Sequence, residues 1–320
     1  MTYSKTLAVI GCGYWGKNLA RNFAQLGALK AIVDPNPETA QIQAEANGVI
    51  AMTLEDALSD SSITMVAIAA PAELHKDLTL QAIAAGKHVY VEKPLALSVE
   101  DGMLMRDEAN KANLTLMVGH LLQYHPVFVA LREKVAAGDF GKLRYAYSHR
   151  LSMGKFRLEE DAFWSLAPHD VSMLLSLFGE APSEVRGGGL DFVTKGISDE
   201  SRIDMVFPSG GRAHVFVSWL HPFKEQRLVV VGEKLMAVFD DTRPWSEKLA
   251  LYAHYVDTDK DVPVPVKADV EYLDVPQGEP LKAECEHFLD SVLTNQTPFS
   301  DAEEALRVLR VMDAVKLPKG

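Results

Sequence analysis

The chain has 320 residues, about twice the length of a typical domain, so we expect two domains. Apolar residues make up 48% and charged residues 24%, the composition of a globular protein that can bury a core without staples. The net charge of −12 argues against nucleic acid and anionic membranes as partners, and the sequence contains no 18-residue apolar run that could form a transmembrane helix.

The cysteine content indicates the redox environment. Cys12 and Cys285 are the two cysteines, and they give neither a disulfide framework nor a Cys/His spacing typical of a metal site. We therefore expect no bound metal and a reducing, cytoplasmic location. The apolar run near the N-terminus extends for about six residues before glycines interrupt it, which argues against a signal peptide.

Apolar runs and helical periodicity alternate over the first 120 residues. We expect strands at residues 6–10, 29–33, 65–70, 88–92 and 114–118, and helices at 14–26, 36–46, 73–85 and 98–112. Gly27 and Gly86 follow two of these helices, as C-terminal capping glycines do. Such alternation predicts a parallel sheet with helices on both faces.

The pattern changes after about residue 122. Helices are expected at residues 126–137, 168–178, 279–293 and 301–315, and strands at 143–151, 183–192, 201–207, 212–219, 226–231 and 236–240. Glycine-containing turns at 208–211 and 232–234 suggest antiparallel hairpins. Residues 256–276 are rich in proline, valine and aspartate and indicate irregular or edge structure.

These patterns predict a doubly wound α/β Rossmann domain over residues 1–121 and an α+β domain with an open, mostly antiparallel sheet over 122–320. The second domain would bind substrate and mediate oligomerisation. The C-terminal helix at 301–316 could instead pack back on the first domain, and the sequence leaves this open.

A glycine motif follows the first expected strand. Gly11, Gly13 and Gly16 form GxGxxG where a helix begins, and Asp34 ends the next strand. The three glycines would permit a tight turn, close approach of the backbone to a pyrophosphate, and close helix–strand packing, with Tyr14 and Trp15 in the same loop. Asp34 would accept hydrogen bonds from the adenosine ribose and repel a 2′-phosphate, which favours NAD over NADP.

Three further segments contain residues suited to catalysis or cofactor binding. Glu92-Lys93-Pro94 ends a strand, where ligands of doubly wound sheets bind, although residue type alone favours a surface lysine before a turn proline. Pro168 and His169 are expected to begin a helix, where the pKa of a histidine is lowered, or the histidine is simply satisfied by capping contacts. Ala70 and Pro71 would let a nucleotide ring lie close to the backbone, and His75 alone is more typical of a structural helix residue.

These motifs together resemble the Gfo/Idh/MocA oxidoreductase family. The matching residues are Gly11, Gly13, Gly16, Ala70, Pro71, His75, Glu92, Lys93, Pro94, Val118, Gly119, Pro126, Pro168, His169 and Asp170. The resemblance implies that Lys93 contacts both nicotinamide and substrate, and that His169 is its partner in proton transfer. It implies cofactor contacts from Glu92, Gln123 and His75, and dimers or tetramers formed through the second sheet.

Two positions depart from the family pattern. Ser165 stands where members often have an aspartate four residues before the histidine, and residues 120–125 lack the arginine that many members have there. The usual Asp–His–Lys trio is thus reduced to Lys93 and His169, and the sequence does not decide which of them is the immediate base.

Residues 119–126 and 218–227 resemble family members that act on nucleotide-linked amino sugars such as UDP-N-acetylglucosamine. This implies NAD-dependent oxidation of the sugar's C3 hydroxyl. Arg150 or Lys155 could clamp a diphosphate, and Trp164 or Tyr124 could pack on a sugar or uracil ring. The alternatives are oxidation of a free polyol such as an inositol, reduction of a nucleotide keto-sugar, and a non-catalytic cofactor-sensing protein.

Overall fold

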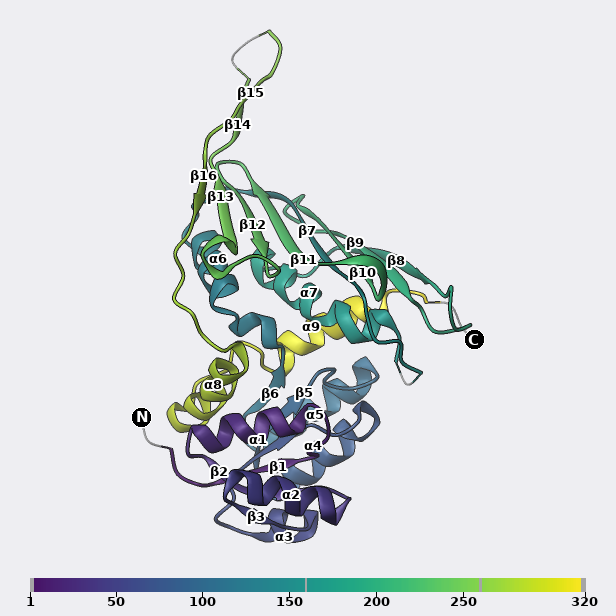
Figure 1. Cartoon of the computed structure of the whole chain (residues 1–320), viewed down its shortest axis with the longest axis vertical. Helices are drawn as coiled ribbons and strands as arrows, with labels where there is room; N and C mark the ends of the chain where they lie inside the picture. Colours follow the sequence, from purple (N-terminus) through teal and green to yellow (C-terminus); the bar gives the residue numbers. More distant parts are fainter. Residues whose placement is uncertain (1–2, 159, 259–260, 318–320) are drawn as a thin grey trace. The chain divides into compact units, whose positions relative to one another are not determined.

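The computed structural model describes residues 3–158, 160–258 and 261–317 (Figure 1). The chain forms two compact units. The first comprises Met1–Tyr124 and Glu279–Leu309, and the second comprises His125–Gly278 and Arg310–Gly320. The chain thus returns to the first unit after building most of the second.

The first unit contains a six-stranded parallel sheet in the order β3-β2-β1-β4-β5-β6, the order of a doubly wound dinucleotide-binding fold. Its strands are β1 (Leu7–Ile10), β2 (Leu29–Val33), β3 (Ile50–Ala51), β4 (Met65–Ile68), β5 (His88–Glu92) and β6 (Leu116–Gly119). The predicted parallel sheet is confirmed. The carboxyl ends of β1, β2, β4 and β5 lie along one edge, where three of the predicted motifs follow the strands.

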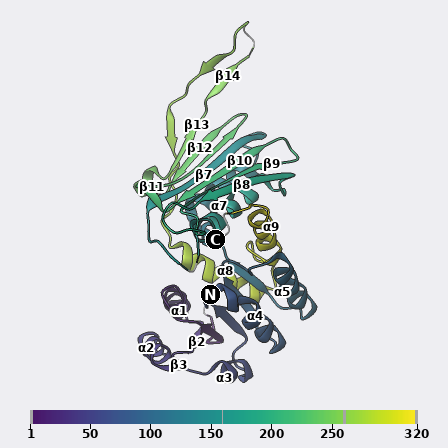
Figure 2. The same ribbon diagram turned by 90° about the vertical axis from the view of Figure 1, so that its right-hand side faces the viewer.

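Helices cover both faces of this sheet. They are α1 (Gly16–Gln25), α2 (Pro37–Asn47), α3 (Leu54–Ser59), α4 (His75–Ala84), α5 (Val99–Lys111) and α8 (Pro280–Thr294), with short 3₁₀ turns η1 (Ala72–Leu74) and η2 (Leu121–Tyr124). Figure 2 shows α1 and α2 on one side of the sheet and α4 and α5 on the other. Helix α8 packs against α1.

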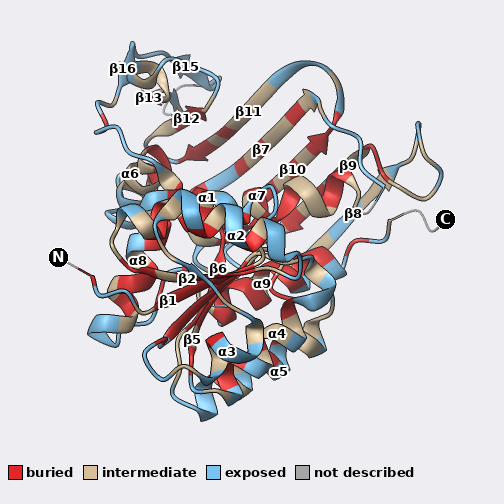
Figure 3. Cartoon of the chain, turned by 60° about the horizontal axis from the view of Figure 1, so that its bottom comes forward, coloured by how far each residue is buried: buried red, intermediate tan, exposed pale blue. Residues whose placement is uncertain are grey.

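The core of the first unit explains why α8 belongs to it. All four residues of β1 are buried, as expected for a central strand of a parallel sheet (Figure 3). The ring of Tyr90 from β5 makes edge contacts with Phe23 of α1 and Phe288 of α8, at centroid distances of 6.3 and 5.9 Å. Phe288 is fully buried, so this cluster fixes α8 on the sheet.

The second unit contains an eight-stranded sheet in the order β16-β13-β12-β11-β7-β10-β9-β8. Its strands are β7 (Leu143–Met153), β8 (Glu184–Leu190), β9 (Glu200–Val206), β10 (Arg212–Ser218), β11 (Leu220–Gly232), β12 (Met236–Asp240), β13 (Leu249–Tyr252) and β16 (Val270–Tyr272). The pairs β9–β10 and β11–β12 are antiparallel, which confirms the predicted hairpins. The pair β7–β10 is parallel, so the sheet is mostly, not wholly, antiparallel.

One face of the second sheet is covered by helices. Helix α6 (Pro126–Ala136) contacts β12, and α7 (Ala162–Phe178) packs on β7 and β10. Along β10, Ala213, Val215 and Val217 are buried, while Arg212, His214 and Phe216 between them are more exposed. This alternation is what a sheet covered on one face requires.

The start of α7 corrects one prediction. The helix begins at Ala162 and not at Pro168, because Asp161 caps it: its carboxylate accepts a hydrogen bond of 2.9 Å from the backbone N–H of Trp164. Pro168 therefore lies inside the helix, where its nitrogen has no hydrogen to donate to the preceding turn. His169 therefore lies about two turns inside the helix and not at its N-terminus, where the sequence had placed it.

Residues 256–276 contain more regular structure than expected. They include the short strands β14 (Tyr255–Asp257) and β15 (Val264–Val266), paired in an antiparallel hairpin, and β16 at the edge of the large sheet. The remaining elements are the 3₁₀ turn η3 (Trp245–Glu247) and α9 (Ala302–Asp313). Within the described part of the chain, none of the helices has the length and apolar character that crossing a membrane requires.

Candidate active site

The glycine turn between β1 and α1 leaves space for a ligand to approach the backbone closely. Gly11 has φ +87°, and a Cβ there would lie 2.8 Å from the carbonyl oxygen of Ala69. A Cβ on Gly16 would lie 1.9 Å from the carbonyl oxygen of Gly11, so only glycine allows the helix to approach the strand. A Cβ on Gly13 would meet no atom within 4 Å, which leaves open space beside the backbone where the dinucleotide fingerprint places a pyrophosphate.

Asp34 joins the end of β2 to this turn. Its carboxylate accepts hydrogen bonds from the backbone N–H of Cys12 at 2.8 Å and of Asn36 at 2.9 Å. These bonds hold the carboxylate at the edge of the sheet with oxygen lone pairs still available to a ligand. The arrangement suits the ribose hydroxyls of an adenosine.

A cavity of about 1190 Å³ opens beside the glycine turn and Asp34. Its lining includes five residues predicted from sequence, namely Gly11, Gly13, Asp34, Ala70 and Pro71. The remaining wall is mainly apolar and includes Pro35, Met52, Leu54, Leu74 and Leu78. Apolar walls for a planar base, a carboxylate for a ribose and an open glycine for phosphates are the features that NAD requires, so the residues present fit this cofactor.

His75 is buried and does not line this cavity. Its Nδ1 lies 2.7 Å from the carbonyl oxygen of Pro94, and its Nε2 lies 2.9 Å from that of Ala70. Burial lowers the pKa of His75. The imidazole therefore connects the loop after β4 to the loop after β5, which positions Ala70 and the Lys93–Pro94 segment.

Glu92 and Lys93 follow directly from β5. The Glu92 carboxylate accepts hydrogen bonds from the indole N–H of Trp15 and from the backbone N–H of Lys93, the latter at 3.3 Å. The Tyr90 hydroxyl lies 3.0 Å from the same carboxylate. Trp15 thereby links the glycine loop to the segment that bears Lys93.

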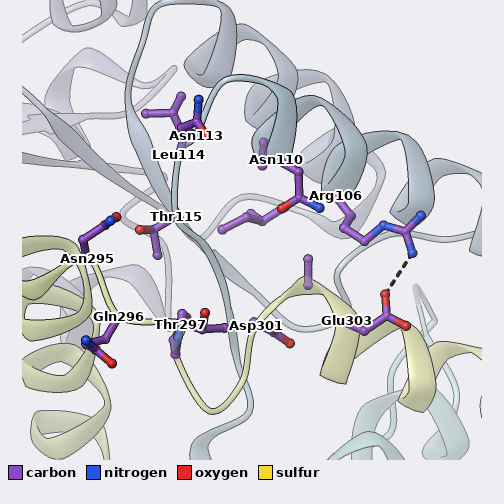
Figure 4. A pocket seen from close by; sticks show the side chains of 14 residues that line it. Arg106, Asn110, Asn113, Leu114, Thr115, Asn295, Gln296, Thr297, Asp301 and Glu303 are labelled. Atoms are coloured by element: carbon purple, nitrogen blue, oxygen red, sulfur yellow. Dashed lines mark hydrogen bonds and ion pairs between the residues drawn. The ribbon is translucent and has the colours of Figure 1, made fainter.

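A second cavity of the first unit, of about 590 Å³, has a different character (Figure 4). It is lined largely by amide and hydroxyl side chains, among them Asn110, Asn113, Thr115 and Gln296. Arg106 and Glu303 form an ion pair of 2.8 Å at its edge. None of the residues predicted from sequence lines it, so we assign the cofactor to the cavity beside Asp34.

The second unit presents the other predicted catalytic residue. His169 is half-buried on α7, and Trp164 lies on the same helix with its ring edge-on to Phe163 at 5.8 Å. Ser165 is partly buried one turn before His169. Lys155 is exposed in the segment between β7 and α7.

Arg150 has an intramolecular partner. Its Nε and Nη2 donate to the two oxygens of Asp170, at 2.8 and 3.1 Å, and Asp170 also accepts a hydrogen bond of 2.6 Å from Ser148. Asp170 is fully buried, so this bidentate pair joins β7 to α7. With the guanidinium engaged in this way, Lys155 is the better candidate of the two for contacting a diphosphate.

The structure corrects the expectation for Tyr124. Its ring is buried in the core of the first unit, and its hydroxyl lies 2.9 Å from that of Ser300. The ring also packs against the imidazole of His287 at a centroid distance of 5.2 Å. Tyr124 therefore has no ring face available for a sugar or uracil. Gln123, expected to contact the cofactor, is also buried in η2.

Comparison with known proteins agrees with the dinucleotide-binding fold described above. Residues 5–120 match the family model described as "Oxidoreductase family, NAD-binding Rossmann fold", and residues 128–238 match the "GFO/IDH/MocA C-terminal domain". The chain belongs to the GFO/IDH/MocA oxidoreductase family. As a family member it is an NAD-dependent oxidoreductase, and the cavity beside Gly13 and Asp34 is where we place NAD.

Several relatives of this GFO/IDH/MocA protein are characterised. It is 29% identical over 303 residues to the UDP-N-acetylglucosamine 3-dehydrogenase of Acidithiobacillus ferrooxidans, covering 94% of this chain and 93% of the relative. A solved structure of that enzyme superposes with a TM-score of 0.87, covering 98% of this chain and 97% of the other. The scyllo-inositol 2-dehydrogenase (NAD(+)) of Bacillus subtilis is 26% identical over 248 residues, 72% of each chain.

Sequence reasoning missed some residues of the cofactor cavity. Met52, Thr53 and Leu54 line it from the connection after β3 and from the start of α3. Strand β3 has two residues and α3 has six, so neither gives a periodic signal long enough to detect. Thr53 could have been found as a helix cap, because Asp56 follows three residues later.

Proposed function

We propose that the chain oxidises the C3 hydroxyl of UDP-N-acetylglucosamine to a ketone with NAD. The observation that carries this proposal is full-length similarity, in both units, to an enzyme of that activity. When bound, NAD supplies the hydride acceptor at its nicotinamide.

In this proposal Lys93 acts on the hydroxyl that is oxidised. Lys93 directly follows β5, at the carboxyl edge of the sheet where ligands of doubly wound folds bind. The bonds of Glu92 to Trp15 and of His75 to Pro94 hold the backbone on either side of this lysine. As the neutral amine, a lysine fixed in this way can accept the hydroxyl proton as the hydride leaves the sugar carbon, and it becomes the ammonium.

We propose His169 as the second proton-transfer residue. It would act without the aspartate that family members often have at position 165, and a histidine exchanges protons readily near neutral pH. Lys155 would contact the diphosphate and Trp164 would pack on a ring of the substrate. These three residues would give the second unit the role of selecting the substrate.

A free polyol is the second candidate substrate. One relative is a scyllo-inositol 2-dehydrogenase (NAD(+)) and another is an inositol 2-dehydrogenase, each 26% identical over 69–72% of this chain. The engaged guanidinium of Arg150 also favours this candidate, because it removes one of the two predicted diphosphate contacts. A nucleotide keto-sugar reductase remains the third candidate.

We further propose a cytoplasmic enzyme that forms a homodimer or homotetramer through the second sheet. Away from α7, this sheet presents partly exposed aromatic rings: Tyr147 stacks on His214 at 5.1 Å, and His149 lies edge-on to Phe216 at 5.9 Å. Clustered aromatic side chains of this kind are enriched at protein interfaces. Light scattering of the His214→Asp variant should show a smaller assembly than the wild type.

The substrate panel is the direct test. Purified protein with NAD is given UDP-N-acetylglucosamine, free N-acetylglucosamine or inositols, and formation of NADH is followed by absorbance. The proposal expects turnover with the nucleotide sugar and little with the free ones. Turnover with an inositol alone would support the second candidate, and turnover with none would revive the cofactor-sensing alternative.

A further inference from the structure

Two carboxyl groups share one hydroxyl in the core of the first unit. The Tyr90 hydroxyl lies 3.0 Å from Oε1 of Glu92 and 3.0 Å from Oε2 of Glu284. Tyr90 and Glu284 are both fully buried, and they come from β5 and α8, which the chain reaches nearly two hundred residues apart. We call these three side chains the buried carboxyl array.

The number of hydrogens available for the two contacts of the Tyr90 hydroxyl limits the charge of the buried carboxyl array. A tyrosine hydroxyl carries one hydrogen, so it can donate to only one of the two carboxyl groups. At its other contact the hydroxyl oxygen must accept, and a carboxyl group donates only when it is protonated. At least one of the two glutamates therefore carries a proton, and the array holds at most one negative charge.

The neighbours of each carboxyl group indicate where the charge lies. Burial raises the pKa of Glu92, but hydrogen bonds from the indole N–H of Trp15 and the backbone N–H of Lys93, together with the Lys93 ammonium, oppose this rise. Among the residues that the structure describes, Oε1 of Glu284 is buried without a hydrogen-bond partner. A charge is stable where donors and a cation meet it and unstable where a buried oxygen has neither.

The charge of Glu92 favours the neutral form of Glu284, whereas the hydrogen bond with Tyr90 favours the charged form. Cys285 on the same helix and Tyr124 from η2 also interact electrostatically with Glu284. Burial raises the pKa of both Cys285 and Tyr124, which keeps them neutral. Burial and the charge of Glu92 together raise the pKa of Glu284 well above its usual value.

We propose that Glu284 is protonated at neutral pH and donates to Tyr90, which in turn donates to an ionised Glu92 beside Lys93. Glu284 and Tyr90 are thereby positioning residues for the lysine, a role that rests on the proposed function. Donation into the tyrosine oxygen strengthens its own donation to Glu92. The array thus keeps a negatively charged carboxylate next to Lys93, the lysine that takes up the proton in the proposed function.

Gly119 at the end of β6 leaves room for this array. A Cβ there would lie 2.6 Å from the Tyr90 hydroxyl and 2.8 Å from Oε2 of Glu92. Any side chain at this position would displace one of the two groups. The array therefore accounts for a glycine that the fold of β6 alone does not require.

The location of the proton is tested without substrate. In infrared spectra of the full chain at neutral pH, Glu284→Gln should lose a carbonyl band of a protonated carboxylic acid. The control Glu286→Gln, an exposed residue on the same helix, should keep it. A band that persists in Glu284→Gln, or that is lost in Glu92→Gln instead, would overturn the proposal.

Unfolding gives a second readout of the same proton. In the unfolded chain Glu284 ionises near the ordinary glutamate pKa of 4.5, whereas the folded residue keeps its proton. The contribution of Glu284 to the free energy of unfolding is therefore complete below pH 4.5 and is lost as the pH rises toward the folded pKa. From about pH 5 to about pH 8, the urea midpoint of the wild type should fall relative to that of Glu284→Gln. Parallel curves would contradict a protonated Glu284.

The positioning role is tested by the pH dependence of kcat. Tyr90→Phe removes the donor to Glu92, so the Glu92 carboxyl group protonates more easily. Without this negative charge the pKa of Lys93 falls, and the limb of the kcat–pH profile that reports Lys93 should move to lower pH. Glu284→Gln, whose amide donates as the acid does, should keep this limb near its wild-type position. Coincident profiles for Tyr90→Phe and wild type would reject the role. Without any sugar turnover, the infrared and unfolding results still decide where the proton lies.

Discussion

Asp34 serves local structure and, as we propose, cofactor choice. Its carboxylate accepts hydrogen bonds from two backbone N–H groups and lines the cavity in which we propose that NAD binds. The sequence was sufficient to find it, because a strand, a glycine turn and a helix are consecutive and their geometry is local. The same holds for Gly11 and Gly16, whose close contacts tolerate no Cβ.

Replacing Asp34 tests cofactor choice. We expect Asp34→Ala to weaken NAD roughly tenfold or more, because hydrogen bonds to a charged group contribute about 1.5–3 kcal/mol. The ratio of NAD to NADP affinity should fall, since the charge that repels a 2′-phosphate is gone. Fluorescence titration with both cofactors measures this, and an unchanged ratio would refute the assignment.

Replacing Lys93 tests the proposed base. Lys93→Ala should lower kcat by at least about a hundredfold, the usual contribution of a positioned proton acceptor, while NAD affinity changes little. Lys111→Ala, an exposed lysine on α5, is the matched control and should behave as wild type. Turnover by Lys93→Ala within a few-fold of wild type would exclude the role.

Helix α7 shows what pattern reading resolves and what it misses. The sequence correctly predicted a helix ending at Phe178, but Pro168 suggested a start at that residue because proline is common in first turns. The capping hydrogen bond of Asp161 and the packing of α7 on β7 and β10 outweigh the bond that the proline removes. Such tertiary compensation is not visible in a local pattern.

The cap of α7 supports the helix that bears His169. Asp161→Ala should lower the free energy of unfolding by about 1 kcal/mol, because it removes the acceptor for the Trp164 N–H. Asp161→Asn retains a good capping group and should be close to wild type. Urea denaturation of the three proteins distinguishes them, and equal stabilities would mean that the cap contributes nothing.

The pair of Arg150 and Asp170 connects β7 to the same helix. Asp170→Ala should destabilise the protein by roughly 3–5 kcal/mol, because it leaves a guanidinium in the interior without its partner. Arg150→Met with Asp170→Leu should recover part of this loss. If Arg150→Met instead raises KM for a nucleotide sugar without a loss of stability, Arg150 binds substrate after all.

At the scale of the whole molecule, the sequence predicted the architecture of both units correctly. It did not predict which distant segments of the chain belong to the same unit. Helix α8 belongs with the first unit, and Ser300, 176 residues after Tyr124, contributes to burying that tyrosine. The proton held by Glu284 depends on the same return of the chain. Contacts between segments so distant in sequence leave no trace in composition or periodicity, which is why Tyr124 was misassigned and Glu284 overlooked.

The most direct test of the central claim is a crystal structure of Lys93→Ala with NAD and UDP-N-acetylglucosamine. We expect the pyrophosphate beside Gly13, the adenosine ribose on Asp34, and C3 of the sugar roughly 3–3.5 Å from C4 of the nicotinamide. A different ring carbon facing the nicotinamide, or a cofactor bound away from the glycine turn, would contradict the account.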